Sequence, residues 1–375
     1  MEHRLALLTL NMLPGIGPWR KRMLVEYFGS VEGALSATEE ALSKVHGIGP
    51  RLARQLHGWR NHCDPLEEVR FATQCGVLIL TEDDDCYPPL LREISDPPIC
   101  LYVRGNVQAL AHSEMSIALV GSRNATNYGC RMARALAMDA CRQGFPVVSG
   151  LARGIDTAAH QASLEAGGIT IAVTGSGLAD IYPRENLPLA ATIAERGGAV
   201  ISEFPMKYQP DKRSFPMRNR IISGITRGCI VVEAGCQSGS LITAGCALEQ
   251  GRTVFAVPGM VDAPYARGCH SLIRDGAVLT ESFQDVINEL TLLPGLKEPP
   301  PERHASPPPP PSTNLPASLT GLEKLLYEKI TAGEEFIDNL IDATGEAPSC
   351  VNAALITLEL KRLIRRCPGS RVEQT

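Results

Sequence analysis

Several features that define common classes of protein are scarce or missing in this sequence. Aromatic residues make up only 5% of the 375 residues, which is too few for a long stacking platform of Phe and Tyr. No run of about 18 apolar residues occurs, and no basic segment followed by an apolar stretch opens the chain. We therefore expect a cytoplasmic protein with no membrane insertion and no export.

Cysteine is present at twelve positions, but not in a pattern that binds metal. No Cys-x-x-Cys pair occurs, and no Cys/His cluster has zinc spacing. Cys229, Cys246 and Cys269 stand singly among apolar or small neighbours, as reduced and packed thiols do. We expect no metal and no cofactor.

An excess of positive charge is also missing, because the formal net charge is -5. Nucleic-acid-binding domains are often basic overall, so this value argues mildly against that class. The argument is weak, since a local cluster of arginines in a cleft sets the field that a ligand meets.

The N-terminal region, residues 1–62, has a helical pattern that predicts a SAM-like, helix-hairpin-helix domain. It contains two similar hairpins, Leu13-Pro14-Gly15-Ile16-Gly17 and Val45-His46-Gly47-Ile48-Gly49. Such a hairpin directs backbone N–H groups at a phosphate, as a small anion nest does. A turn that only packs two helices fits the pattern equally well, and both interpretations stay open.

The C-terminal part consists of a linker and a small final domain. Residues 294–319 are proline-rich, with an unbroken run from Pro307 to Pro311, and predict a semi-rigid linker. Residues 320–375 predict a winged-helix-like domain, with two helical segments, a longer helix and a turn at Pro368-Gly369. Because the longer helix has few positive charges, duplex binding and protein interaction are equally open for this domain.

Residues 63–293 predict the main domain, an extended α/β domain with a Rossmann-like core at residues 116–290. Short, continuously apolar segments alternate with helical stretches, which is the pattern of a parallel sheet covered on both faces. Right-handed crossovers place all strand-to-helix loops on one edge, where ligands bind. The predicted strands are residues 117–120, 147–149, 170–174, 199–202, 230–233, 254–257 and 277–279.

The loops at this edge share glycine, serine and arginine. Glycine lets the backbone approach a ligand closely, helix N-terminal N–H groups favour an anion, and arginine offers a charged fork to a phosphate. A single loop of this kind is more often an ordinary tight turn, whereas several on one edge favour phosphate binding. The candidate binding residues are Gly121, Ser122, Arg123, Gly150, Arg153, Gly154, Ser238, Gly239 and Ser240.

A second basic cluster lies between Lys207 and Arg220, with Tyr208 and Phe215 among the charges. Basic groups interleaved with aromatic rings suit a strand of nucleic acid with unpaired bases. The alternative is a solvated loop anchored by Phe215. We add to the candidate DNA-binding residues Lys212, Phe215, Arg218, Asn219 and Arg220.

Groups for catalysis are sparse, and we expect no enzyme. Asp156 and His160 stand four apart and could pair, although a helix cap or a buried hydrogen bond explains them as well. Glu203 and Glu233 each end a predicted strand, but no nucleophile stands beside a base. Neither a GxGxxG dinucleotide motif nor a GxxxxGK[ST] phosphate loop occurs. The alternative is a nucleotide phosphoribohydrolase-like Rossmann enzyme, which needs a PGGxGT-type loop where this chain has residues 233–240.

Taken together, these motifs resemble the DNA-processing protein A (DprA/Smf) family over most of the chain. The stretches that carry the resemblance are Val120 to Arg123, Ser149 to Asp156 with His160, Phe215 to Gly224, Glu233-Ala234 followed by Ser238 to Ala244, and Val257-Pro258-Gly259.

The resemblance implies a bacterial, cytosolic homodimer that dimerises through its Rossmann core. It further implies binding of incoming single-stranded DNA during natural transformation and loading of the RecA recombinase onto that DNA. Arg123 matches the family's phosphate-contacting arginine, and Lys212 falls near its DNA-binding lysine. A scaffold that recruits partners through the linker and the final domain is a further alternative.

Overall fold

In this computed structural model the chain divides into two compact units, residues 1–302 and 303–375. The residues that the structure describes are 2–291, 319, 321–331, 337–361, 363–367 and 371–374. The predicted linker, residues 294–319, therefore lies outside the described residues except for Leu319. None of the described helices is long and apolar enough to cross a membrane.

The N-terminal helices are joined by the two hairpins that the sequence indicated. One hairpin connects α1 to α2 and the other connects α4 to α5, with Gly15 and Gly47 at φ +84° and +80°, a conformation that favours glycine. Arg20 donates to the carbonyl oxygens of both glycines, at 2.6 and 3.0 Å. The hairpins therefore brace each other. The helices are α1 (His3–Met12), α2 (Pro18–Phe28), α3 (Val31–Ser36), α4 (Glu39–Leu42) and α5 (Pro50–His57), followed by α6 (Pro65–Gln74).

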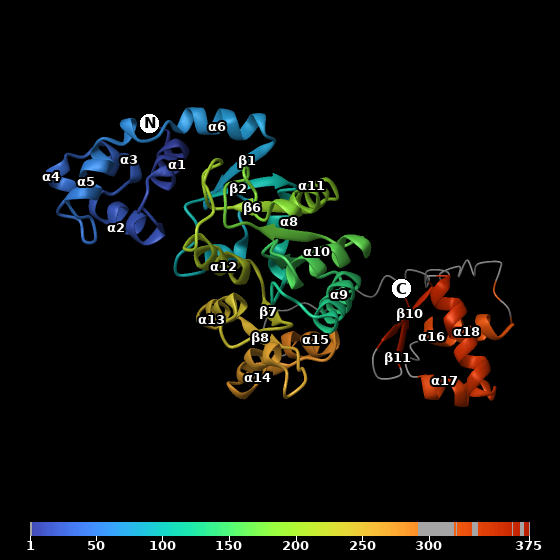
Figure 1. Ribbon diagram of the computed structural model, residues 1–375. Helices are drawn as coiled ribbons and strands as arrows, with labels where there is room; N and C mark the ends of the chain where they lie inside the picture. Colours follow the sequence, from blue (N-terminus) through green and yellow to red (C-terminus); the bar gives the residue numbers. More distant parts are fainter. Residues whose placement is uncertain are drawn as a thin grey trace. The chain divides into compact units, whose positions relative to one another are not determined.

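A nine-stranded sheet forms the centre of the first unit (Figure 1), in the order β1-β2-β6-β5-β4-β3-β7-β8-β9. Strands β3 to β9 run parallel, as predicted, while β2 pairs antiparallel with both β1 and β6 and makes the whole sheet mixed. The bounds of β3, β4 and β6 match the prediction. The strands are β1 (Val77–Thr81), β2 (Cys100–Gly105), β3 (Ile117–Val120), β4 (Val147–Ser149), β5 (Thr170–Val173), β6 (Ala199–Ser202), β7 (Gly228–Val231), β8 (Thr253–Ala256) and β9 (Val278–Leu279).

Helices cover both faces of the sheet, and strand alternation decides what each face buries. In β3, Ile117 and Leu119 pack with α9, α10 and α15, whereas Ala118 and Val120 pack with α12 and α13. The helices are α7 (Pro89–Arg92), α8 (Gln108–Ala111), α9 (Asn127–Arg142), α10 (Ile155–Glu165), α11 (Leu187–Glu195), α12 (Ser214–Ile225), α13 (Gly239–Glu249), α14 (Arg267–Arg274) and α15 (Phe283–Thr291). Short 3-10 turns lie at Trp59–Asn61, Ser113–Met115, Arg184–Asn186 and Pro264–Ala266.

The N-terminal helices share an apolar core with the sheet. Leu7 and Leu10 of α1 belong to the same buried cluster as Tyr102 of β2, Val200 of β6 and Met206. The boundary predicted after residue 62 therefore falls between elements that pack together within one compact unit.

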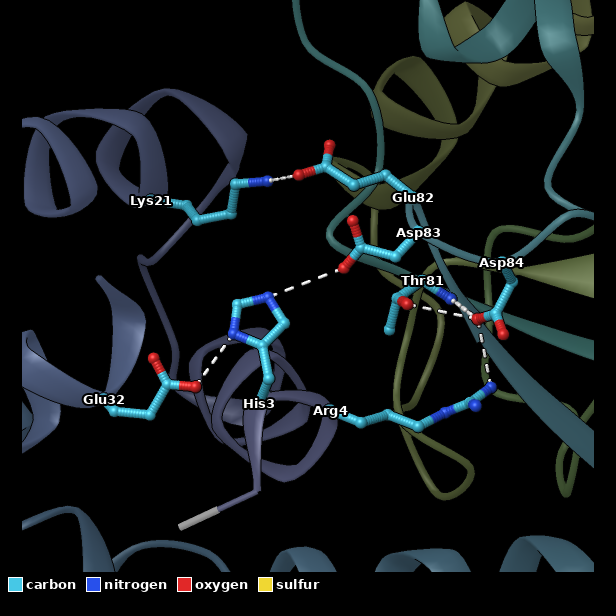
Figure 2. Close-up of polar contacts among 8 residues, drawn as sticks. All are labelled: His3, Arg4, Lys21, Glu32, Thr81, Glu82, Asp83 and Asp84. Carbon is cyan, nitrogen blue, oxygen red and sulfur yellow. Dashed lines mark hydrogen bonds and ion pairs between the residues drawn. The ribbon is translucent and has the colours of Figure 1, made fainter. Parts of the chain in front are cut away.

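Strand β1 lies at one edge of the sheet, where charged side chains form hydrogen bonds with its outward-facing backbone groups. Arg4 of α1 donates to the carbonyl oxygen of Ile79 at 2.6 Å. Figure 2 shows a second contact, in which the N–H of Thr81 donates to Asp84 at 2.7 Å. Arg4 and Asp84 also form an ion pair at 3.0 Å. Capping of this kind prevents edge-to-edge pairing of strands.

The second unit has the predicted winged-helix arrangement. Its described helices are α16 (Gly321–Thr331), α17 (Ile337–Thr344) and α18 (Pro348–Leu360), and its hairpin consists of β10 (Ile364–Cys367) and β11 (Arg371–Gln374). A small core joins them, with the buried side chains Leu326, Leu340, Val351, Leu355, Leu358 and Val372.

Candidate nucleic-acid interface

A cavity of about 490 Å³ lies at the carboxyl ends of β3 and β7, between the loops that the sequence singled out. It brings together most of the predicted binding residues, which come from three separate stretches of the chain. Those that line it are Gly121, Ser122, Arg123, Lys212, Phe215, Arg218, Asn219, Ser238, Gly239 and Ser240.

A smaller cavity of about 200 Å³ shares Arg123, Phe215 and Arg218 with the first. It adds Gly150 and Arg153 from the predicted set, together with Tyr182 and Pro183, which the sequence analysis did not single out. Arg123 and Phe215 thus line both cavities.

Arg123 is exposed, and its guanidinium lies on an aromatic ring rather than beside a carboxylate. Its guanidinium carbon lies 5.1 Å from the centre of the Phe215 ring, a cation–π contact. Within residues 2–291, no carboxylate forms an ion pair with Arg123. The donors of the Arg123 guanidinium therefore remain available to an anion.

Arg218 lies beneath the cavity and connects the loops around it. The buried guanidinium donates to the carbonyl oxygens of Gly150 and Val173, and Asn219 donates to the carbonyl oxygen of Gly239 at 3.3 Å. A Cβ on Gly150 would lie 2.6 Å from the Arg218 guanidinium, so a larger residue there would displace that group. Burial lowers the pKa of Arg218 to about 10, against the opposing charge of Asp156. The group stays charged at neutral pH, and it lines the cavity together with the carboxyl group of Asp156.

Asp156 and His160 do not pair with each other. Asp156 accepts from the N–H groups of Gly150 and Ala152 at 3.1 and 3.3 Å, and burial raises the pKa of its carboxyl. His160 lies 2.7 Å from the Thr170 hydroxyl, which itself donates to Val147. Nδ1 must then donate, which assigns the tautomer. Burial lowers the pKa of His160 to about 3, so this side chain is neutral at pH 7.

The loops at the cavity mouth touch each other directly. Gly154 has φ +73°, and a Cβ there would lie 2.3 Å from the carbonyl oxygen of Ser122. Ser238 is the N-cap of α13, where its hydroxyl accepts from the N–H of Ser240 at 3.4 Å and lies 2.8 Å from that residue's hydroxyl. The N-terminus of α13 thus opens on the cavity and adds the positive end of a helix dipole.

Two of the predicted residues have acidic partners. Arg220 lines neither cavity: it is buried in ion pairs with Glu203 and, at 3.1 Å, with Asp96. Burial raises the pKa of Glu203. Arg153 lines the smaller cavity but is exposed and pairs with Glu185, with one contact at 2.8 Å. These partners were not visible in the sequence because they come from distant segments.

The carboxylate of Glu233 is engaged in hydrogen bonds at the N-terminus of α9. Its carboxylate accepts from the N–H of Thr126 at 2.9 Å and from the Thr126 hydroxyl, and Thr126 is the N-cap of α9. A negative charge at a helix N-terminus is favourable. Among the described residues, no group of three His, Cys, Asp or Glu side chains gathers as a metal site would.

Asp211 is a contributor that the sequence analysis missed. Its carboxylate accepts from the N–H groups of Arg213 and Ser214 at 2.8 and 2.7 Å, which fixes the turn that presents Lys212 at the start of α12. The signal was present in the order Asp211-Lys212-Arg213-Ser214, because Asp commonly caps a turn that opens a helix.

The fold and the cavity together define a class of protein. It is a Rossmann-type protein whose glycine- and serine-rich loops line a cavity at the strand ends, with a helix-hairpin-helix and a winged-helix domain in the same chain. The family described as DNA recombination-mediator protein A matches residues 78–291. A SAM-like helix-hairpin-helix tandem matches residues 7–57, and the DprA winged helix domain matches residues 306–370. The chain belongs to the DNA-processing protein A (DprA/Smf) family, as its motifs predicted.

Individual relatives agree with this assignment. Protein Smf of Synechocystis is 35% identical over 392 residues, which cover 98% of each chain. The X-ray structure of DNA processing protein A from Streptococcus pneumoniae has a TM-score of 0.65 at 36% identity and covers 77% of this chain and 98% of that one. The protein from Helicobacter pylori, described for its single-stranded DNA binding mode, has a TM-score of 0.52 at 28% identity and covers 58% of this chain and 96% of that one.

Proposed function

We propose that this protein binds single-stranded DNA in the cavity at the carboxyl edge of its sheet. The observation that carries the proposal is Arg123, an exposed arginine that lies on the Phe215 ring at the cavity mouth without an acidic partner within residues 2–291. The description of the Helicobacter pylori relative as a single-stranded DNA binder supports it.

The chemistry of the cavity favours a strand over a duplex. Phosphates suit Arg123, exposed Lys212 and the N-terminus of α13, while Phe215 and Tyr182, whose rings lie 5.9 Å apart, offer apolar contact to an unpaired base. A recessed site of about 490 Å³ admits a nucleotide whose base is free to turn inward. Bases held in a duplex stack cannot turn in this way without the cost of unpairing.

The cellular role that follows is protection of incoming single strands and loading of RecA during natural transformation, by a homodimer in the cytosol. Membership of the DprA/Smf family supports this role. The partner and the dimer are part of the proposal, and no residue of this chain is assigned to either contact.

We further propose that the protein acts by binding and not by catalysis. The two carboxylates best placed for a phosphoribohydrolase, Glu203 and Glu233, are engaged with Arg220 and Thr126. Incubation with nucleoside monophosphates should release no base. Turnover that disappears in Glu233→Gln, with the fold intact, would favour the enzyme.

The test of binding is fluorescence anisotropy with a labelled oligonucleotide, single-stranded or annealed to its complement. We expect tighter binding of the single strand at every salt concentration, with affinity falling as salt rises. Equal affinity for both forms across the series would refute the proposal.

A further inference from the structure

The segment between β6 and α12, residues 203–213, leads from the sheet to the cavity and contains Lys212. It has no helix or strand of its own, yet its first half is buried, including Phe204 and Met206. The position of Lys212 therefore depends on what holds this segment in place.

Helices α1 and α6 hold its first half. Asn11 of α1 donates to the carbonyl oxygen of Glu203 at 3.0 Å. Glu68 of α6, a carboxylate only 9% exposed, accepts from the N–H of Met206 at 2.7 Å. The ammonium group of Lys207 lies 4.6 Å from the centre of the Phe71 ring of α6. Two helices thus make three contacts with residues 203–207, at Glu203, Met206 and Lys207.

Contacts within the unit extend this attachment along the segment. The Phe204 and Tyr208 rings stack at 4.4 Å, and the N–H of Gly177 donates to the carbonyl oxygen of Tyr208 at 2.9 Å. Asp211 then caps the turn into α12. Only Gln209 and Pro210 lie between the anchored stretch and the capped turn. Because this connection is so short, a displacement of Met206 should also displace Lys212.

The N-terminal helices are themselves fixed against the sheet. Figure 2 shows the acidic turn after β1 in contact with α1 and α2: Glu82 with Lys21, Asp83 with His3 at 3.5 Å, and Asp84 with Arg4 at 3.0 Å. The pairs of His3 and Arg4 are the more exposed ones, and exposed pairs contribute little energy each. Together with the shared apolar core, however, they make α1 and α6 a firm support.

We propose that Glu68 is a positioning residue for single-stranded DNA binding, which places Lys212 and Phe215 at the cavity through residues 203–213. This gives α1 and α6 a role in DNA binding that requires no contact between them and DNA. The inference rests on the proposed function, because its consequence is read as affinity for a single strand.

The test compares Glu68→Ala with Glu68→Gln and with Glu67→Ala in the full chain. Gln keeps an oxygen that can accept from the N–H of Met206, whereas Ala has none. Glu67 is an exposed neighbour on α6, so its replacement removes the same charge without touching the segment. Hydrogen exchange is measured without DNA, and anisotropy is measured with a single-stranded oligonucleotide across a salt series.

We expect faster exchange in peptides covering residues 204–214 of Glu68→Ala, with strand peptides unchanged. Its affinity should fall about tenfold, the scale of one charge-assisted contact. The slope of log affinity against log salt should lose about one ion as Lys212 disengages, which a general loss of stability would not produce. Glu68→Gln and Glu67→Ala should behave as the unchanged protein does.

Two results would overturn the inference: fast exchange in the segment with unchanged affinity and slope, or lost affinity with unchanged exchange. If Glu68→Ala does not fold, Asn11→Ala removes the contact at the other end of the anchored stretch and faces the same two outcomes. If the unchanged protein binds no single strand, the proposed function fails, and this result is distinct from either outcome in the variants.

Discussion

Replacing Arg123 by alanine separates DNA binding from stability more cleanly than any other change in the cavity. The side chain is exposed and lies on the Phe215 ring in a cation–π contact, with no ion pair to a carboxylate within residues 2–291. Such a contact at an exposed site is worth about 0.5–1 kcal/mol, so the melting temperature should change little. The loss of a charge-assisted bond to a phosphate should cost about 1.5–3 kcal/mol of binding. That cost corresponds to roughly a 10- to 150-fold weaker affinity.

The assay is anisotropy with a single-stranded oligonucleotide at several salt concentrations, beside a thermal melt. Arg123→Ala should also lower the salt slope by about one ion, and Arg123→Lys should recover only part of the affinity because an ammonium group cannot form a two-point contact. Arg142→Ala is the control, since Arg142 is an exposed arginine at the far end of α9. A lower melting temperature of Arg123→Ala with unchanged DNA affinity would refute the reasoning. Full recovery of affinity in Arg123→Lys would show that Arg123 contributes only its charge and makes no two-point contact.

Three further predictions concern the supports of the cavity. Gly154→Ala should weaken DNA binding and destabilise the fold by about 1–3 kcal/mol in a urea titration, because its Cβ meets the Ser122 carbonyl, whereas Gly144→Ala, with a similar φ of +79° and nothing within 4 Å, should leave DNA binding unchanged. Glu233→Ala should lower the free energy of unfolding by about 3 kcal/mol, the scale of two hydrogen bonds to a charged group, and Glu233→Gln by less; equal stability of all three proteins would contradict this. His160 takes up a proton in the unfolded chain near pH 6.5 but only near pH 3 when folded, so stability should fall on acidification through that window, by up to about 1.4 kcal/mol per pH unit. Urea titrations of His160→Gln should show a shallower slope there, and an identical slope would remove His160 as the cause.

Much of the fold followed from local patterns in the sequence. The strands of the parallel core are short apolar runs between helices, and three of them begin and end where predicted. Strand β2 was missed because Cys100 to Gly105 pairs only with distant segments, antiparallel to β1 and β6. The shared core between α1 and the sheet likewise depends on contacts far apart in the chain, which no local pattern reports.

The candidate site likewise has features that the sequence predicts and features that depend on contacts between distant segments. Crossover handedness sufficed to bring Gly121, Arg123 and Ser238 to one edge, because parallel strands end together. It could not tell which arginine faces solvent. Arg123, Arg218 and Arg220 look alike in sequence, yet one is exposed on Phe215, one lies buried beneath the cavity, and one is buried in ion pairs with Asp96 and Glu203.

The central claim is that the cavity, rather than the hairpins or the winged helix, holds the single strand. Photo-crosslinking with an oligonucleotide that contains 4-thiothymidine, followed by mass spectrometry of the peptides, tests it directly. We predict crosslinks in residues 121–124, 182–183 and 212–219, which line the two cavities, and their loss when unlabelled single strand competes. Crosslinks confined to residues 1–62 or 320–375 would contradict the account.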